Sequence, residues 1–337
     1  MSRTKTVLAC FLAGLLLLAI IVCAGAWYWS ERPVAMADAR IDYLVEPGSS
    51  PRQVARTLKA SGMDLQEDAF VAMARILGQD TQIKAGAYEA EKGDSPRMLL
   101  DRMTAGDMRQ SRLALIEGWT YQRIRQVLRD SPDVEQTLDD VDDDAILERL
   151  GADADAAEGL FYPDTYVFTP GTTDFDLLRR AYVAQNDVLE QAWEERDKDL
   201  PLRSAYDALI LASIVEKETG HAQDRAKIAG VFMNRLRINM ALQTDPTVIY
   251  GMGEAYQGRL RKKDLQQDTP WNTYTRPGLP PTPIASVSRA SLDAVLHPES
   301  HDYLYFVSRG DGTSEFSTSL AAHNRAVSKF ILGRNKQ

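Results

Sequence analysis

Cysteine and histidine are scarce in this chain of 337 residues, and their positions exclude several kinds of chemistry. Both cysteines, Cys10 and Cys23, lie in an apolar N-terminal segment. The rest of the chain therefore has no disulfide, no cysteine nucleophile and no cysteine-ligated metal. Of the four histidines, His297 and His301 alone have a metal-ligand spacing, and Pro298 between them prevents the helix that would place both on one face. We therefore expect no metal and no cofactor.

Motifs for nucleophilic and nucleotide chemistry are also missing. The chain has no Gly-x-Ser-x-Gly elbow, and residues 251–253 lack the third glycine and the strand-to-helix context of a dinucleotide-binding loop. The acid-rich segment 133–148 begins like a calcium loop, but Ala145 stands where the sharp turn needs glycine. We interpret that segment as solvated surface. Carboxylate chemistry, which suits glycosidic bonds, remains.

Positive charge is in short supply as well. Arg3 and Lys5 are two of the 39 basic residues, so the other 37 face 48 acidic residues in the remainder of the chain, a net charge of −11. Such an acidic body lacks the basic footprint of general nucleic-acid binding, and we expect no nucleic-acid partner. The charge does not exclude a polar polymer such as a glycan.

The N-terminus carries a long uncharged segment, residues 6–29, which ends in three aromatic residues. A bilayer span needs about 20 apolar residues, and aromatic residues favour the membrane interface. Arg3 and Lys5 predict that residues 1–5 form a cytoplasmic tail and that residues 30 onward lie outside the cytoplasmic (inner) membrane. A cleaved signal peptide is the alternative, but its apolar core would be shorter, about 7–15 residues. We expect a single-pass transmembrane helix.

A small module follows a linker at residues 30–40. The pattern predicts a strand at residues 41–45, two helices from Pro51 and over residues 67–77, a returning strand at 84–89 and a helix from Pro96. This βααβ order, with Pro-Gly after the first strand, resembles a LysM module over residues 41–106. LysM modules bind glycans that contain N-acetylglucosamine. A small α+β spacer without a ligand is the alternative.

Residues 107–330 read as a mainly helical domain. The pattern predicts strands and helices in this order: a strand at 111–116, helices at 121–128, 174–196, 208–220 and 224–237, mainly loops from Met240, a helix at 286–295, a hairpin of 303–307 with 314–317, and a helix from Ser319. Long polar loops rich in Tyr, Asn, Gln and Pro commonly line a cleft for an extended substrate.

The helix at residues 208–220 is the most apolar part of this domain and ends in acid. Glu218 continues an apolar stripe at helical spacing, and Gly220 is typical of a C-cap. Partial burial raises the pKa of a carboxyl and suits a general acid. Glu216 also follows apolar residues at helical spacing, so periodicity alone does not separate the two. The alternative is a solvated helix end with two surface glutamates.

Several long motifs closely resemble the YceG-like family, with a likeness that covers roughly residues 41–327. They are LASIVEKET at 211–219, FMNRL at 232–236, LQTDPTVIYG at 242–251, NTY at 272–274 and GLPP at 278–281. Glu218 matches the family's catalytic glutamate. The sequence Glu-Thr-Gly at 218–220 is similar to the Glu-Ser-Gly ending of the catalytic helix in lysozyme-like transglycosylases.

The resemblance implies an α+β fold with a transmembrane helix, a LysM-like βααβ module and a lysozyme-like catalytic domain that carries a β-hairpin. It implies a peptidoglycan lytic transglycosylase that cuts nascent strands internally between N-acetylmuramic acid and N-acetylglucosamine, leaves 1,6-anhydromuramyl ends and terminates strand elongation. Penicillin-binding peptidoglycan synthases are partners implied by the family's role alone.

Five loop residues are our candidates for glycan contacts: Gln243, Asp245, Tyr250, Asn272 and Tyr274. Loop structure is the alternative for each. Two other functions stay open from the residues: a two-carboxylate muramidase with Glu218 as acid and Asp245 or Glu216 as the second carboxylate, and a non-catalytic, membrane-tethered peptidoglycan-binding scaffold.

Overall fold

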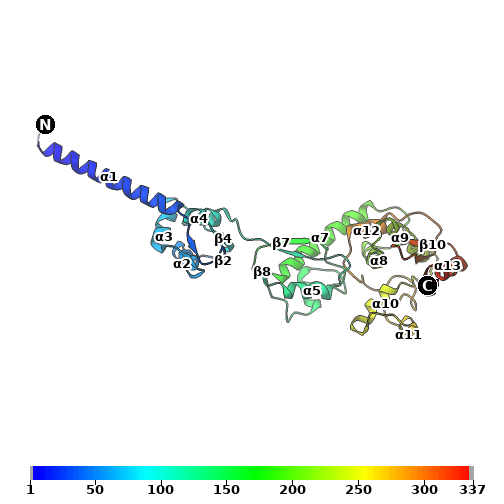
Figure 1. The fold of residues 1–337 in the computed structure, drawn as a ribbon. Coiled ribbons are helices and arrows are strands. Elements are labelled where there is room, and N and C mark those ends of the chain that lie inside the picture. The colour runs from blue at the N-terminus through cyan, green and yellow to red at the C-terminus, as the bar shows by residue number, and fades with distance from the viewer. Residues whose placement is uncertain (1–2, 334–337) are drawn as a thin grey trace. The chain divides into compact units, whose positions relative to one another are not determined.

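The computed structural model describes residues 3–333 and shows a mixed α+β protein (Figure 1). The chain divides into two compact units. Unit 1 runs up to Ser111 and includes residues 167–171, and unit 2 comprises residues 112–166 and the chain from Thr172. The strands β5 (Ser111–Ala114) and β7 (Thr165–Phe168) lie at two of the three places where the chain passes from one unit to the other.

The first element, α1 (Arg3–Glu31), is a long apolar helix. Its stretch Cys10–Glu31 is long and apolar enough to cross a membrane. In the part of the chain that the structure describes, no other helix meets this condition. The large apolar side chains along it are exposed, as expected of a helix whose solvent is lipid. Residues 1 and 2 of the predicted tail lie outside the described residues.

The core of unit 1 is built on an antiparallel strand pair with helices packed against it. The strand β2 (Arg40–Val45) pairs antiparallel with β4 (Gly86–Glu91), and Tyr43 and Tyr88 stack face to face in the core. The helices are α2 (Pro51–Ala60), α3 (Glu67–Ile76) and α4 (Pro96–Ala105). Ser50 and Ser95 cap α2 and α4, each followed by a proline at the first helical position, which explains why the sequence predicted both starts.

One strand pair of unit 1 was not predicted from the sequence. The strand β1 (Ala35–Met36) pairs with β3 (Met63–Asp64), and Val34 is buried in the core, although the sequence predicted a linker at residues 30–40. A two-residue strand is too short to show alternation, because its pairing depends on a partner distant in sequence.

Unit 2 is mainly helical. Its elements are α5 (Tyr121–Asp130), β6 (Val134–Glu135), α6 (Asp143–Leu150), β8 (Thr172–Thr173), α7 (Asp174–Glu195), α8 (Ala205–Glu218), α9 (Ala222–Arg237), α10 (Asp245–Met252), η1 (Gly253–Ala255), α11 (Lys262–Gln266), α12 (Arg289–Leu296), β9 (Tyr305–Ser308), β10 (Ser314–Ser317), α13 (Leu320–Val327) and the π-helical turn η2 (Ser328–Leu332). The hairpin of β9 and β10 is antiparallel, as predicted, and β6 pairs parallel with β8.

Helix α8 lies at the centre of unit 2. Every residue from Ala208 to Val215 is buried, and α8 packs against α7, α9, α10 and α12. Ser213 Oγ donates to Ile210 O at 2.7 Å and accepts from Ile284 N at 3.0 Å, which ties the helix to the segment before α12. This rigid setting fixes the position of the carboxylates at its C-terminal end.

Three expectations for unit 2 were wrong in detail. Gly220 is not the C-cap, because α8 ends at Glu218 with the extended residue Thr219 as its cap. The segment 245–252, predicted as loop, is the helix α10, with Pro246 in its first turn. Within the acid-rich segment 133–148, predicted as solvated surface, Asp142 caps α6, and Ile146 and Leu147 are buried.

Candidate functional site

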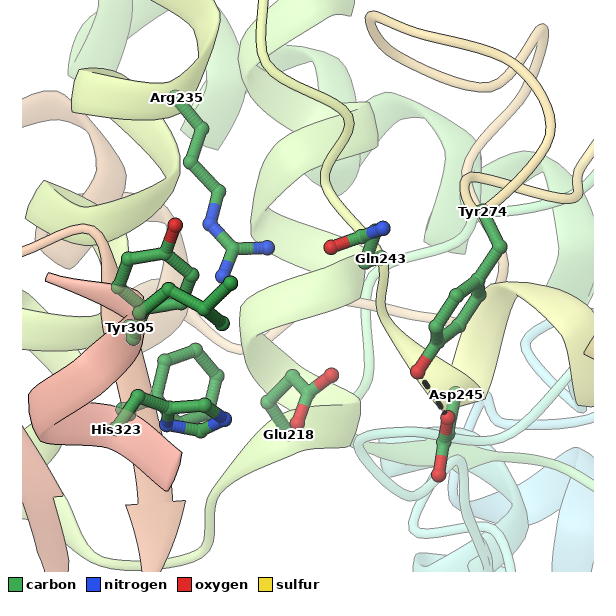
Figure 2. A pocket seen from close by; sticks show the side chains of 9 residues that line it. Glu218, Arg235, Gln243, Asp245, Tyr274, Tyr305 and His323 are labelled. Carbon is green, nitrogen blue, oxygen red and sulfur yellow. Dashed lines mark hydrogen bonds between the residues drawn. The ribbon is translucent and has the colours of Figure 1, made fainter. Parts of the chain in front are cut away.

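Glu218 lines a pocket of about 340 Å³ at the C-terminal end of α8. The pocket is lined by Glu218, Arg235, Gln243, Asp245, Tyr274, Tyr305, Phe306, Leu320 and His323. Figure 2 shows Arg235, Tyr305 and His323 on one side of Glu218, and Gln243, Asp245 and Tyr274 on the other. The pocket therefore gathers α8, α9, the segment before α10, the loop before α12, the hairpin and α13.

A threonine from the segment before α10 holds the Glu218 carboxylate. Thr244 Oγ1 donates a short hydrogen bond to Glu218 Oε1. Thr244 itself is 2% exposed, and its backbone N–H donates to Thr273 Oγ1 at 3.1 Å. The hydroxyl of Thr247 lies 2.8 Å from Thr273 Oγ1. This buried threonine cluster fixes which way the carboxylate points.

The surroundings of Glu218 favour its protonated form. Burial raises the pKa of Glu218 to about 7, and the negative charge of Asp245 acts in the same direction. The Thr244 hydroxyl and the Arg235 guanidinium lower the pKa and only partly offset these effects. A carboxyl with a pKa near neutrality can give up a proton and take it back, as an acid–base catalyst requires.

Arg235 brings a cation to the pocket from α9. Its Nε donates to Leu304 O at 2.7 Å and its Nη1 donates to Leu242 O at 2.6 Å. Its guanidinium also lies over the Tyr305 ring at 5.4 Å. The side chain is 6% exposed, so it links α9 to the start of β9 and to the segment that carries Thr244. In the sequence, this arginine stands out only as part of the FMNRL motif at 232–236.

Two predicted contact residues meet on the opposite side of the pocket. Tyr274 Oη donates to Asp245 Oδ1 at 2.6 Å. Gln243 lines the pocket from a left-handed backbone with φ of 48°, and its N–H donates to Thr273 O at 3.1 Å. A non-glycine residue in this conformation costs free energy, and such positions are concentrated at functional sites.

His323 is a pocket residue for which the sequence predicted no role. Its ring stacks on Tyr305 with centroids 5.3 Å apart. Burial lowers the pKa of His323, and the Arg235 charge lowers it further, so both favour the neutral form of the ring. Its Nδ1 is buried without a hydrogen-bond partner among residues 3–333. No spacing rule connects α13 to α8, so only the fold shows that it reaches the site.

Two other predicted contact residues lie away from this pocket. Asn272 is fully buried, and its amide donates to Leu265 O and Gln267 O while its Oδ1 accepts from Tyr274 N at 2.8 Å. It shapes the loop that presents Tyr274. Tyr250 lines a second pocket of about 680 Å³ and stacks edge to face on Trp271.

The second pocket has its own buried carboxyl, Glu158. Burial raises its pKa to about 7, although it accepts a hydrogen bond from Tyr121 N at 3.0 Å. Glu158 is 5% exposed, and its carboxyl also interacts with the Tyr250 hydroxyl and the Gly159 backbone. Glu158 thereby joins the start of α5 to α10.

The two glutamates of α8 occupy different surroundings. Glu216 accepts hydrogen bonds from Ser288 N, at 3.0 Å, and from Ser288 Oγ, at the start of α12, and it does not line the Glu218 pocket. The two side chains point to different sides of the helix end because they are two residues apart. Among the described residues, no three His, Cys, Asp or Glu side chains form a group that could hold a metal ion.

Comparison with known proteins yields consistent matches. The sequence model of the YceG-like family matches residues 43–329. The endolytic murein transglycosylase of Bacillus subtilis (strain 168) is 29% identical over 338 residues, which cover 94% of this chain and 93% of that protein. The endolytic murein transglycosylase of Streptococcus pneumoniae serotype 2 is 27% identical over 85% of this chain and 58% of its own length. A crystal structure of a yceG-like protein from Listeria monocytogenes has a TM-score of 0.54 and 28% identity, over 85% of this chain and 98% of that one.

Proposed function

The chain belongs to the YceG-like family, and from this premise we propose that it is an endolytic murein transglycosylase anchored to the membrane by α1. It is a lyase that acts on the glycan strands of peptidoglycan. The observation that carries this proposal is Glu218, a carboxyl of raised pKa at the end of a buried helix, open to a polar pocket within the family's own motifs.

The proposed reaction uses Glu218 first as an acid and then as a base. The protonated carboxyl donates to the oxygen that links N-acetylmuramic acid to N-acetylglucosamine, and the bond to the anomeric carbon breaks. The carboxylate then accepts the proton of the muramyl C6 hydroxyl, whose oxygen bonds to the anomeric carbon. The product carries a 1,6-anhydro ring, no water is consumed, and Glu218 returns to its starting state. A pKa of about 7 suits both steps.

The other pocket residues support this cycle in the proposal. The Arg235 charge stabilises the carboxylate that exists between the two steps, since it opposes the rise in the pKa of Glu218. Gln243, Asp245 and Tyr274 contact the sugars, because they line the pocket opposite Arg235. Asn272 positions Tyr274 through the loop that both share, and Tyr250 belongs to the neighbouring pocket.

A two-carboxylate muramidase is the competing function. Asp245 lines the same pocket as Glu218 and supplies the second carboxylate that such a hydrolase requires. Glu216 is a weaker candidate for that role, because both its hydrogen bonds go to Ser288.

Mass spectrometry of digested peptidoglycan distinguishes the two reactions. Intact glycan strands are incubated with the full-length protein, and the new ends are analysed. We expect 1,6-anhydromuramyl ends and internal cleavage. Reducing ends would contradict the lyase mechanism and favour the hydrolase. The Glu218→Gln protein should be inactive, whereas Glu216→Gln should retain cleavage. A Glu218→Gln protein that cleaves as fast as the wild type would remove the catalytic assignment of Glu218. Absence of cleavage by the wild type would favour the scaffold function.

The arrangement along the chain supports the remaining parts of the proposal. The helix α1 crosses the cytoplasmic membrane with Arg3 and Lys5 inside, so that units 1 and 2 meet nascent glycan on the outer face. The βααβ order of β2, α2, α3 and β4 supports a LysM-like glycan-binding role for unit 1. The lysozyme-like character of unit 2 and an association with penicillin-binding synthases belong to this proposal as well.

A further inference from the structure

Exposed apolar side chains of unit 1 gather close to the end of α1. Among residues 32–111, four large apolar side chains are well exposed: Leu44, Ile76, Leu77 and Met98. Ile76 is the most exposed of them at 82%. Single exposed apolar residues are normal on protein surfaces. Here, however, three of the four belong to the C-terminal end of α3 and the N-terminal turn of α4.

A chain of polar contacts places these two ends beside the last turn of α1. Glu31 Oε1 lies 3.8 Å from Arg97 Nε, the neighbour of Met98 on α4. Arg97 pairs with Asp101 at 3.7 Å one turn later, and Asp101 accepts from Gln79 Nε2 at 2.9 Å. Gln79 follows Ile76 and Leu77 by two to three residues. Ile76, Leu77 and Met98 therefore lie at the two helix ends that this chain of contacts links to the end of α1.

The segment that follows α1 is short and is held directly against the core of unit 1. Trp29 packs against the core of unit 1, and Val34, three residues after Glu31, is part of that core. Val34 N donates to Asp94 O at 2.8 Å, which fixes the chain as soon as the helix ends. If α1 spans the bilayer, Trp27 and Tyr28 lie at the membrane interface. Unit 1 then rests directly on the lipid headgroups.

The charged groups near these apolar residues include the carboxylates of Glu31 and Asp101, which pair with Arg97, and two further arginines. Arg75 precedes Ile76 and is exposed, and Arg32 is exposed one residue after α1. Basic side chains beside inserted apolar ones bind anionic headgroups. We propose that Arg75, Ile76, Leu77 and Met98 form a lipid-binding surface, called here the lipid-facing patch, through which unit 1 lies on the outer surface of the bilayer. This inference rests on the membrane anchoring in the proposed function.

The lipid-facing patch determines how unit 1 is presented. A single helix leaves a domain free to tilt and rotate, whereas a second contact beside the helix restricts both motions. The turn after β2, which begins at Glu46, lies at the opposite end of the strand pair, because Arg40 pairs with Glu91 close to Asp94 and Val45 pairs with Gly86. That turn points away from the membrane in the proposed arrangement.

Site-specific fluorescence in lipid nanodiscs tests the patch on the full chain. The body has no cysteine, so replacing Cys10 and Cys23 by alanine gives a background for single cysteines at Ile76, Leu77 or Met98. Each is labelled with an NBD fluorophore and placed in nanodiscs of phosphatidylethanolamine and phosphatidylglycerol, with or without brominated acyl chains. Cys23 alone, inside α1, is the positive control, and Glu46→Cys is the matched control on unit 1.

We expect labels at Ile76, Leu77 and Met98 to shift to shorter wavelength and to be quenched by brominated lipid, approaching the Cys23 label, while the Glu46→Cys label stays aqueous. If Cys23 is quenched and the three labels behave like Glu46→Cys, the patch is refuted and the anchor stands. An aqueous Cys23 label would overturn both. Glycan cleavage by the same labelled proteins is measured in parallel, so a failure of the enzymatic proposal is seen separately.

Discussion

At the scale of one residue, the surroundings of the Glu218 carboxyl affect both the stability of the protein and the chemistry of the pocket. A carboxyl that is largely buried, close to Asp245 and held by Thr244, costs folding free energy when it is ionised. The same arrangement makes it a proton donor near neutral pH. Active sites commonly trade stability for such a shifted pKa.

Glu218→Gln should therefore be inactive but more stable than the wild type. We expect the free energy of unfolding at pH 8 to rise by about 1–3 kcal/mol, allowing for partial solvent screening, because the amide still accepts from Thr244 and carries no charge. The folded-state pKa of about 7 exceeds the ordinary value of 4.5, so the wild type loses stability as the pH rises between them. The gain should thus shrink at pH 5. Urea denaturation of both proteins at the two pH values measures it, and a less stable variant at pH 8 would contradict it.

Asp245→Asn should move the pH dependence of cleavage. In the proposed mechanism cleavage requires protonated Glu218, so its rate should fall as the pH rises through about 7. Burial is the main cause of the raised pKa, and the Asp245 charge adds to it. Removing that charge should shift the alkaline limb of the profile to lower pH. The rate of glycan cleavage is measured from pH 5 to pH 9.

The matched control for Asp245→Asn is Tyr274→Phe. It removes the 2.6 Å hydrogen bond to Asp245 but leaves the charge in place, so the alkaline limb should not move to lower pH. An unchanged limb in Asp245→Asn would show that Asp245 does not tune Glu218.

At the scale of an element, helix α9 shows what a sequence pattern predicts and which packing contact it does not predict. Its amphipathic pattern predicted the helix from sequence, and Ile228, Val231 and Phe232 are buried as expected. The pattern did not reveal that Gly230 allows the segment 299–301 to lie against the helix. A Cβ at Gly230 would come within 2.5 Å of Glu299 O and 2.7 Å of His301 Nε2.

Gly230→Ala should therefore destabilise unit 2. We expect a loss of about 1–3 kcal/mol in the free energy of unfolding, because one of two packed segments must move. The control is Gly220→Ala, where an added Cβ meets nothing within 4 Å and the change should stay within about 0.5 kcal/mol. Thermal and urea unfolding of both variants measure the difference. Equal stabilities would show that the segment 299–301 moves away at no cost.

At the scale of the whole molecule, α1 and the two units have separate tasks in the proposed function. The apolar helix anchors the chain, unit 1 is placed at the membrane surface, and unit 2 carries the Glu218 pocket. Helix α1 is itself part of unit 1, and Trp29 near its end packs against the core of that unit.

Replacing residues 1–26 by a cleavable signal peptide should release the protein from the membrane. The full chain should stay with the membrane pellet after an alkaline carbonate wash, because an apolar helix of about 20 residues spans the bilayer, whereas the shortened chain should be soluble. Trp29 is kept so that the unit 1 core is intact. Proteinase added to spheroplasts should digest the full chain after α1, and protection would reverse the predicted orientation.

Much of the fold follows from local sequence signals. The starts of α2 and α4 are set by Ser-Pro caps, and the hairpin by Gly310 and Gly312 after the apolar residues of β9. The short pairs β1–β3 and β6–β8 could not be predicted in this way, because two paired residues leave no periodic pattern. The helix α10 was missed because its polar start, Gly251 near its end and Gly253 just after it are typical of a loop.

The sequence by itself determined the apolar anchor, the capped helices and the family motif that singles out Glu218. Only the tertiary structure decided what surrounds that carboxyl. It turns Glu216 toward Ser288, places Thr244 on Glu218, and brings Arg235 and His323 from two other helices to the same pocket. The physical reason is that burial and charge depend on neighbours in space. Helical spacing gives both glutamates similar apolar stripes, and only packing against α10, α12 and α13 makes their surroundings differ.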